Sequence, residues 1–266
     1  LAIVNGGNAL ATVIAAPLGS FLGALVGWRG AFFCIVPVAA IAAVWLLLSL
    51  PAMRPRGHAG SGNVLRLMKR MPVALGMLAV SVLFMGQFML FTYLRPFLET
   101  VTQVSAATLS LMLLVLGVAG FVGTFLIERF LQQSLYRTLI AIPLLLAVIA
   151  LALVGFGGSA VTTTVLLGGW GLVATAAPVA WWTWLARTLP DDAEAGGGLM
   201  VAIIQLAIAA GATAGGLVFD LSGYRATFES SAALLVLAAA LAFGCAMASC
   251  KATASWSRAD MPGLDL

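Results

Sequence analysis

Charged side chains are nearly absent from long stretches of this sequence, and that restricts its fold more than any other feature. Hydrophobic residues make up 62% of the chain and charged residues 8%, and the mean hydropathy is +1.12. A soluble domain carries about 25% charged residues. The chain therefore lacks the polar surface that a soluble fold needs, and we expect an integral membrane protein.

The apolar stretches have the length of membrane-crossing helices. A helix of about 20 residues crosses the hydrocarbon core, whereas an open strand leaves its backbone groups unpaired in lipid. The alternating polarity of a membrane barrel is absent. We therefore expect an all-α membrane protein with eight transmembrane helices, over residues 2–27, 31–50, 73–94, 104–127, 138–157, 161–186, 199–219 and 230–249.

Lysine and arginine are distributed unevenly over the loops between these stretches. Ten of the 13 fall on one side of a membrane that the chain crosses eight times, and three fall on the other. Because such an excess marks the cytoplasmic face, we expect a multi-pass protein of the cell inner (plasma) membrane with both chain ends cytoplasmic. The net charge of +4 follows from this bias, so it implies no nucleic-acid partner. The ten cations are Arg54, Arg56, Arg66, Lys69, Arg70, Arg129, Arg137, Arg187, Lys251 and Arg258, and the three are Arg29, Arg95 and Arg225.

A short motif occurs twice, as GWRGAF at residues 27–32 and as GYRATF at residues 223–228. Each copy follows a helix rich in small residues and precedes the last helix of its group. Duplication on this scale is typical of transporters in which two like bundles enclose a central site. We therefore expect four helices before Leu1, the last two helices of an N-terminal bundle at 1–50, a cytoplasmic linker at 51–72, a C-terminal six-helix bundle at 73–250 and a cytoplasmic tail at 251–266.

Four segments resemble one known family. The string AAPLGSFLGALVGWRGAFF (15–33) resembles the fifth-helix antiporter motif of the drug:proton antiporter-1 branch of the major facilitator superfamily. The strings GQFMLFTYLRP (86–96), APVAWWTWLARTL (177–189) and VAIIQLAIAAGATAGG (201–216) are similar to those of purine ribonucleoside exporters in that superfamily. The resemblance covers helices five to twelve, and it implies a major facilitator-type helical bundle of which eight helices out of twelve are present.

The same resemblance implies a function. It indicates a secondary transporter that exports a small molecule, with the proton as coupling ion, the lipid bilayer as surroundings and purine ribonucleosides as first candidate substrate. A sugar (arabinose-like) or multidrug exporter is the alternative, and a truncated, non-transporting membrane remnant is a second one. No ionisable residue lies in the middle of an expected span. Proton coupling normally uses such a group, so we expect the coupling acid in the helices before Leu1.

An enzyme is disfavoured by the same residues. The chain has no paired carboxylates in its apolar stretches, no phosphate-binding loop and one histidine, His58, in a basic loop. No metal site can be assembled around a single histidine of this kind. We therefore expect no catalytic residue, no metal and no cofactor.

Candidate substrate-binding residues are polar or aromatic groups that share one helix face, since a polar side chain has no partner in lipid. Gln87 and Phe91 lie on one stripe of the 73–94 span. Trp170 lies among small residues of the 161–186 span, where a flat ring could stack. Gln205 and Asn8 each precede small residues on a face of their helices. Helix packing is the competing interpretation for all five, through interhelical hydrogen bonds and close backbone approach.

Overall fold

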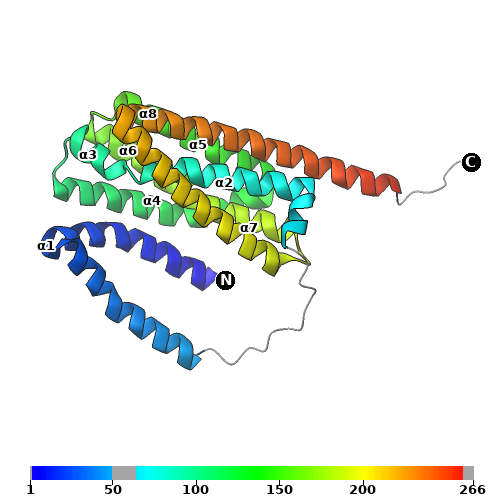
Figure 1. The fold of residues 1–266 in the computed structure, drawn as a ribbon, viewed down its shortest axis with the longest axis horizontal. Helices are drawn as coiled ribbons and strands as arrows, with labels where there is room; N and C mark the ends of the chain where they lie inside the picture. Colours follow the sequence, from blue (N-terminus) through cyan, green and yellow to red (C-terminus); the bar gives the residue numbers. More distant parts are fainter. Residues whose placement is uncertain (1, 50–63, 260–266) are drawn as a thin grey trace, which may run out of the picture.

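Helices joined by short turns make up the part of the protein that the computed structural model describes, residues 2–49 and 64–259 (Figure 1). No strand occurs in these two ranges. Helices satisfy their backbone groups internally, which a chain this apolar requires in lipid. The elements are α1 (Ala2–Ser49), the short 3-10 helix η1 (Val64–Lys69), α2 (Met71–Phe91), α3 (Leu94–Thr100), α4 (Ala106–Gln133), α5 (Leu135–Phe156), α6 (Ala160–Ala174), α7 (Ala176–Thr188) and α8 (Ala193–Ala259).

Two glycines bend the longest elements at equivalent positions of the repeated motif. Gly27 in α1 has φ 74° and ψ 168°, and Gly223 in α8 has φ 79° and ψ −178°. This backbone region is open essentially to glycine alone. Each bend is followed by an arginine over an aromatic ring, at 4.9 Å for Arg29 on Trp28 and 6.0 Å for Arg225 on Tyr224. The two copies of the motif thus form the same corner.

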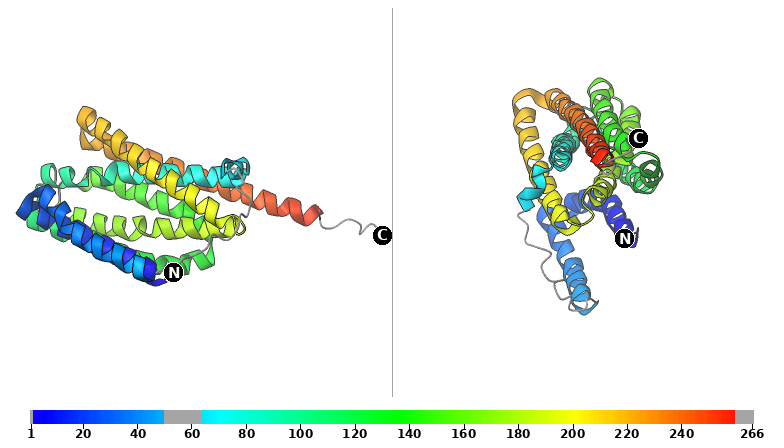
Figure 2. Two further views of the ribbon diagram at one scale, coloured as in Figure 1. Left: turned by 60° about the horizontal axis from the view of Figure 1, so that its bottom comes forward. Right: turned by 90° about the vertical axis from the view of Figure 1, so that its right-hand side faces the viewer.

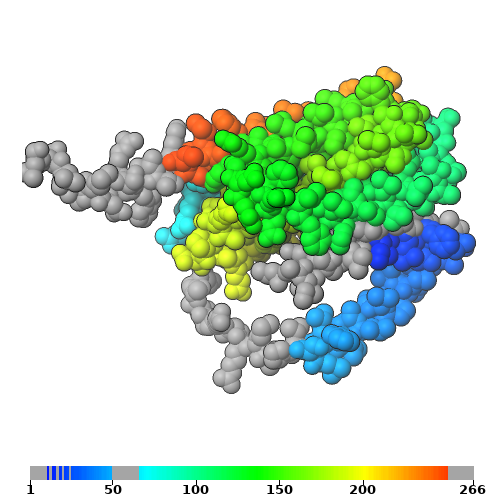
Figure 3. All heavy atoms as spheres, turned by 180° about the vertical axis from the view of Figure 1, so that it is seen from behind, coloured from blue at the N-terminus to red at the C-terminus, as the bar shows by residue number. Residues whose placement is uncertain are grey.

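The bends give α1 and α8 two arms each. The first arm of α1 lies beside α4, and its second arm turns away from the other helices (Figures 1 and 2). From behind, the second arm is separated from the remaining helices along most of its length (Figure 3). Its apolar side chains are exposed, among them Phe33, Trp45 and Leu48. Exposed apolar surface of this extent indicates contact with lipid or with further helices.

Six helical stretches of the described chain are long and apolar enough to cross a membrane. This count differs from the eight that the sequence predicts, for two reasons. The stretch Ala193–Cys250 is counted once although Gly223 interrupts it. The first arm of α1 has many side chains outside the described set, and the one stretch found in α1, Leu25–Ser49, covers its second arm. The chain is a multi-pass, all-α membrane protein in either count.

The predicted boundaries of the linker and tail fall partly outside the described residues. Within the predicted linker, residues 50–63 are not described, η1 follows them and α2 begins at Met71. Of the predicted tail, residues 251–259 continue α8 beyond the apolar stretch that ends at Cys250, and residues 260–266 are not described.

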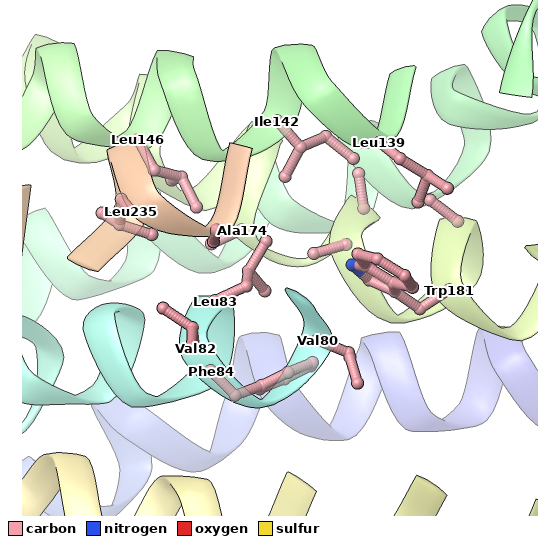
Figure 4. Packing of buried hydrophobic residues seen from close by; sticks show 14 of the residues in the cluster. Val80, Val82, Leu83, Phe84, Leu139, Ile142, Leu146, Ala174, Trp181 and Leu235 are labelled. Carbon is pink, nitrogen blue, oxygen red and sulfur yellow. The ribbon is translucent and has the colours of Figure 1, made fainter. Parts of the chain in front are cut away.

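Helices α2 and α4–α8 form one bundle with an apolar core. In the close-up, Leu83 of α2, Leu139 and Ile142 of α5, Trp181 of α7 and Leu235 of α8 converge on the same region (Figure 4). The helices approach one another closely at glycines, as small-residue interfaces do in membranes. A side chain at Gly211 would meet the carbonyl of Met85, and one at Gly171 would meet the carbonyl of Leu116.

Candidate functional site

A cavity of about 880 Å³ opens among α2, α4, α6 and α7. Its volume lies in the range of roughly 300–1,000 Å³ that is usual for small-molecule sites. Most of the lining is apolar, with a few amide, hydroxyl and indole groups. The lining residues are Phe84, Gln87, Phe88, Phe91, Leu116, Gly117, Gly120, Phe121, Thr124, Trp170, Gly171, Ala174, Thr175, Pro178, Val179, Trp182, Thr183, Ala186 and Arg187.

Aromatic rings of α2 form one wall of the cavity. The rings of Phe84 and Phe88 are stacked at 6.4 Å, and those of Phe88 and Phe91 meet edge to face at 5.9 Å. Their spacing along the helix places them on the same stripe as Gln87. An apolar wall of this kind favours a ligand with a flat, weakly hydrated surface.

Two polar atoms at the cavity are buried without a partner. The Oε1 of Gln87 and the Nε1 of Trp170 have no hydrogen-bond partner, and Trp170 is 1% exposed. A buried polar atom left without a partner costs about 1–3 kcal/mol. Both side chains line the cavity, but the two atoms are closed off from it in this conformation. A rotation of each side chain would bring one acceptor and one donor to a polar, uncharged ligand.

Two other indole nitrogens are also buried without a partner, but neither residue lines this cavity. Trp181 and Trp184 pack against each other at 5.4 Å in the core of the bundle. Their position near the predicted cytoplasmic end of the span would suit tryptophans that anchor a helix at the membrane surface. This interpretation is wrong for both, because their side chains are buried inside the bundle. Trp182, which lies between them in the sequence, is exposed and lines the cavity. Trp170 differs from both because its side chain lines the cavity.

The helix between Ala160 and Thr188 is interrupted where it passes the cavity. Helix α6 ends at Ala174, α7 begins at Ala176, and Thr175 lies at the break. The Thr175 hydroxyl can donate to the carbonyl of Gly120 in α4, at 2.7 Å, or to that of Gly171, at 2.9 Å. Pro178 has no N–H, so the carbonyl four residues earlier lacks its usual helical donor. The break therefore adds polar backbone to an otherwise apolar wall.

Charge is scarce at the cavity. Arg187 is the one charged residue among those that line it, and no aspartate or glutamate takes part. Within the described ranges, no three His, Cys, Asp or Glu residues lie close enough to hold a metal ion. Such a lining is suited to recognition by shape, stacking and neutral hydrogen bonds.

Three of the five residues predicted from sequence meet at this cavity, namely Gln87, Phe91 and Trp170. Gln205 does not, because α8 contributes no residue to the cavity and Gln205 is exposed. The side chain of Asn8 lies outside the described set. The sequence prediction also missed the lining residues Thr124, Thr175, Thr183 and Arg187. Gly117, Gly120 and Thr124 repeat at helical spacing in α4, which is the signal that could have found that wall.

A bundle of apolar helices around a ligand-sized cavity defines a polytopic membrane protein. Residues 1–211 match the family model of the Major Facilitator Superfamily, and the chain belongs to that superfamily. The superfamily consists of transporters rather than enzymes. The sequence resemblance to this superfamily is therefore confirmed.

Several curated proteins are similar to the chain. It is 62% identical over 245 residues to the "Transcription regulatory protein OpdE" of Pseudomonas aeruginosa, a match that covers 91% of this chain and 61% of that protein. It is 39% identical over 241 residues to the "Purine ribonucleoside efflux pump NepI" of Escherichia coli K12, with the same shares covered. The NepI of Salmonella paratyphi B is 38% identical over 239 residues, which cover 90% of this chain and 60% of that protein. The chain thus spans about three fifths of the length of the relatives it matches.

Proposed function

We propose that the chain belongs to an exporter and that the 880 Å³ cavity is the part of its substrate site contributed by one helical bundle. The observation that carries the proposal is the pair of buried, unpartnered atoms on Gln87 and Trp170 at a cavity of ligand size. The membership in a transporter superfamily supports it. The relatives named efflux pumps support the outward direction.

Purine ribonucleosides are the substrates we propose. The amide of Gln87 has both donor and acceptor groups, and the indole N–H of Trp170 is a donor. A purine offers complementary acceptors and donors on its edge and a flat face for the rings of Phe88 and Phe91. A neutral nucleoside also agrees with a lining that has no carboxylate. The 39% identity to NepI supports the same class of substrate.

The membrane topology is part of the proposal. The bends at Gly27 and Gly223 each divide one long element, which gives eight spans if every arm crosses the bilayer. Two of these spans belong to an N-terminal bundle and six to a C-terminal bundle, with the 51–72 segment between them on the cytoplasmic side. The excess of lysine and arginine supports that orientation. The transporter works by antiport with protons, and its coupling acid lies outside the cavity described above.

A regulatory role is a second candidate function. The relative with 62% identity is named a transcription regulatory protein. A membrane protein with this cavity could bind a small molecule as a signal without exporting it. Export of sugars or drugs, or a remnant without transport, are further outcomes that the same experiment separates.

The test is transport by the full-length protein in everted membrane vesicles, with radiolabelled inosine, arabinose and a cationic dye offered in turn. We expect uptake of inosine that needs an imposed proton gradient and is lost when the gradient is dissipated. Gradient-dependent uptake of only the sugar or only the dye would show that this compound, and not a nucleoside, represents the substrate class. Binding of inosine without uptake would favour the regulatory role, and neither binding nor uptake of any of the three would contradict the proposal.

A further inference from the structure

A second cavity, of about 530 Å³, lies between α4, α5 and the residues around the α6–α7 break. It shares no lining residue with the first cavity, because the two use different faces of α4 and α6. Its lining is largely apolar and includes Leu126 of α4, Leu145 of α5 and Leu172 of α6. All three side chains are exposed, so in a membrane this cavity is open to the surrounding lipid.

One end of this cavity is polar. Gln133 and Ser134 lie there at the end of α4, and Arg137 and Thr138 lie there in the first turn of α5. The Thr138 hydroxyl already donates to the carbonyl of Ser134 at 2.9 Å. Arg137 is exposed and forms no ion pair, since the single ion pair of the described residues joins Arg95 and Glu99. Arg137 therefore has its full hydrogen-bonding capacity free at the mouth of an apolar groove.

We propose that this groove binds one anionic phospholipid, with an acyl chain along the apolar part and the phosphate on the guanidinium of Arg137. The polar end coincides with the junction of two membrane-crossing helices, which is where headgroups lie. Cations at this depth attract anionic lipid, and a guanidinium matches phosphate geometry. The apolar lining, which includes Leu126 and Leu145, favours a ligand with an acyl chain over a soluble anion.

The charged neighbours support the choice of Arg137. Glu128 and Arg129 are exposed on α4 but do not line the groove. Helical spacing places Glu128 on the opposite side of α4 from Phe130, which does line it. The groove thus presents a positive end without a carboxylate beside it. Arg129 is a matched control, because it has the same charge and lies near the end of α4 but does not line the groove.

The experiment is a lipid titration of the purified full-length protein followed by native mass spectrometry. Dioleoyl phosphatidylglycerol and dioleoyl phosphatidylcholine have the same acyl chains and differ in net charge. We expect one phosphatidylglycerol to bind about fivefold more tightly than phosphatidylcholine, as one favourable cation contact implies. Arg137→Gln should abolish that preference, Arg137→Lys should keep part of it, and Arg129→Gln should leave it unchanged.

Two further measurements separate a lipid from a bare anion. Leu145→Trp narrows the groove and should weaken the binding of both lipids, while inorganic phosphate at millimolar concentration should displace neither. The proposal is overturned if Arg137→Gln retains the preference of the parent protein. It is also overturned if the two lipids bind equally, or if phosphate displaces phosphatidylglycerol from the site.

Discussion

The hydroxyl of Ser231 donates a 2.6 Å hydrogen bond to the backbone carbonyl of Gly86, 145 residues earlier in the chain. Ser231 is fully buried, and the bond joins the second arm of α8 to α2 at the centre of the bundle. The bond can form because α2 and α8 approach closely at Gly86. A Cβ atom at position 86 would lie 3.0 Å from the Cβ atom of Leu234. The hydrogen bond thus attaches α2, which forms one wall of the cavity, to α8.

Loss of this bond should have a small, measurable effect on stability. Interhelical hydrogen bonds in membrane proteins contribute about 0.6 kcal/mol on average and rarely more than about 1.7. We expect Ser231→Ala to lower the free energy of unfolding by that average. The measurement is unfolding in mixed micelles of increasing dodecyl sulfate content. Ser222→Ala, at an exposed serine of the same helix, should have no effect, and an equal loss in both variants would contradict the assignment.

The contact between α4 and α6 should be more sensitive to substitution than the Ser231 hydrogen bond, because the two helix backbones touch there. A side chain at Gly123 would meet the carbonyl of Leu172, and one at Gly171 would meet that of Leu116. We expect Gly171→Ala to destabilise the bundle by about 1–3 kcal/mol, since the two helices must move apart. Gly168→Ala is the matched control in α6, with its nearest atom at 3.5 Å. If Gly171→Ala unfolds in dodecyl sulfate at the same point as Gly168→Ala, the close contact is not formed.

The corner at Gly223 depends on a conformation that only glycine adopts without strain. The added Cβ in Gly223→Ala meets nothing within 4 Å, so any loss of stability comes from the backbone angles alone. We expect a cost of about 1–3 kcal/mol. Gly198→Ala, in the helical part of α8 with equally open surroundings, should be neutral or stabilising. Equal thermal stability of Gly223→Ala and the parent protein would show that this corner is not bent as described.

The cation bias predicts an orientation that can be measured in whole cells. Cysteines are introduced at Ser61 and Ser159 in a variant without the three native cysteines, and an impermeant thiol reagent is added outside. We expect labelling at Ser159 and none at Ser61, since the 51–72 segment is predicted to be cytoplasmic. Labelling at Ser61 but not at Ser159 would reverse the orientation.

Two of the predicted residues that line the cavity share a local signal. Gln87 and Phe91 are on one stripe of a single helix, so their common face follows from helical spacing alone. Gln205 also lies among small residues, but those residues bring α8 against α2 and leave Gln205 outside the cavity. Which face of a helix lines a cavity depends on its neighbours, and spacing within one helix carries no information about them.

The interrupted helix shows a second limit of the sequence. Pro178 indicates a bend, but the break itself lies three residues earlier at Thr175. The lost donor of Pro178 explains this offset of one turn, and the hydroxyl of Thr175 adds a contact to Gly120 of α4, 55 positions earlier, that the sequence does not indicate. The corners at Gly27 and Gly223, in contrast, are marked in the sequence by a repeated motif around each glycine.

The central claim is that Gln87 and Trp170 bind the substrate, and equilibrium binding of tritiated inosine to the purified full-length protein tests it most directly. We expect Gln87→Leu and Trp170→Phe each to weaken binding roughly tenfold to a hundredfold, because each removes a hydrogen bond to a desolvated ligand. Trp170→Ala should weaken it further, since the stacking ring is lost as well. Trp181→Phe removes a buried indole N–H that does not face the cavity, so it should bind inosine like the parent protein. Unchanged affinity in both Gln87→Leu and Trp170→Phe, or an equal loss in Trp181→Phe, would contradict the account.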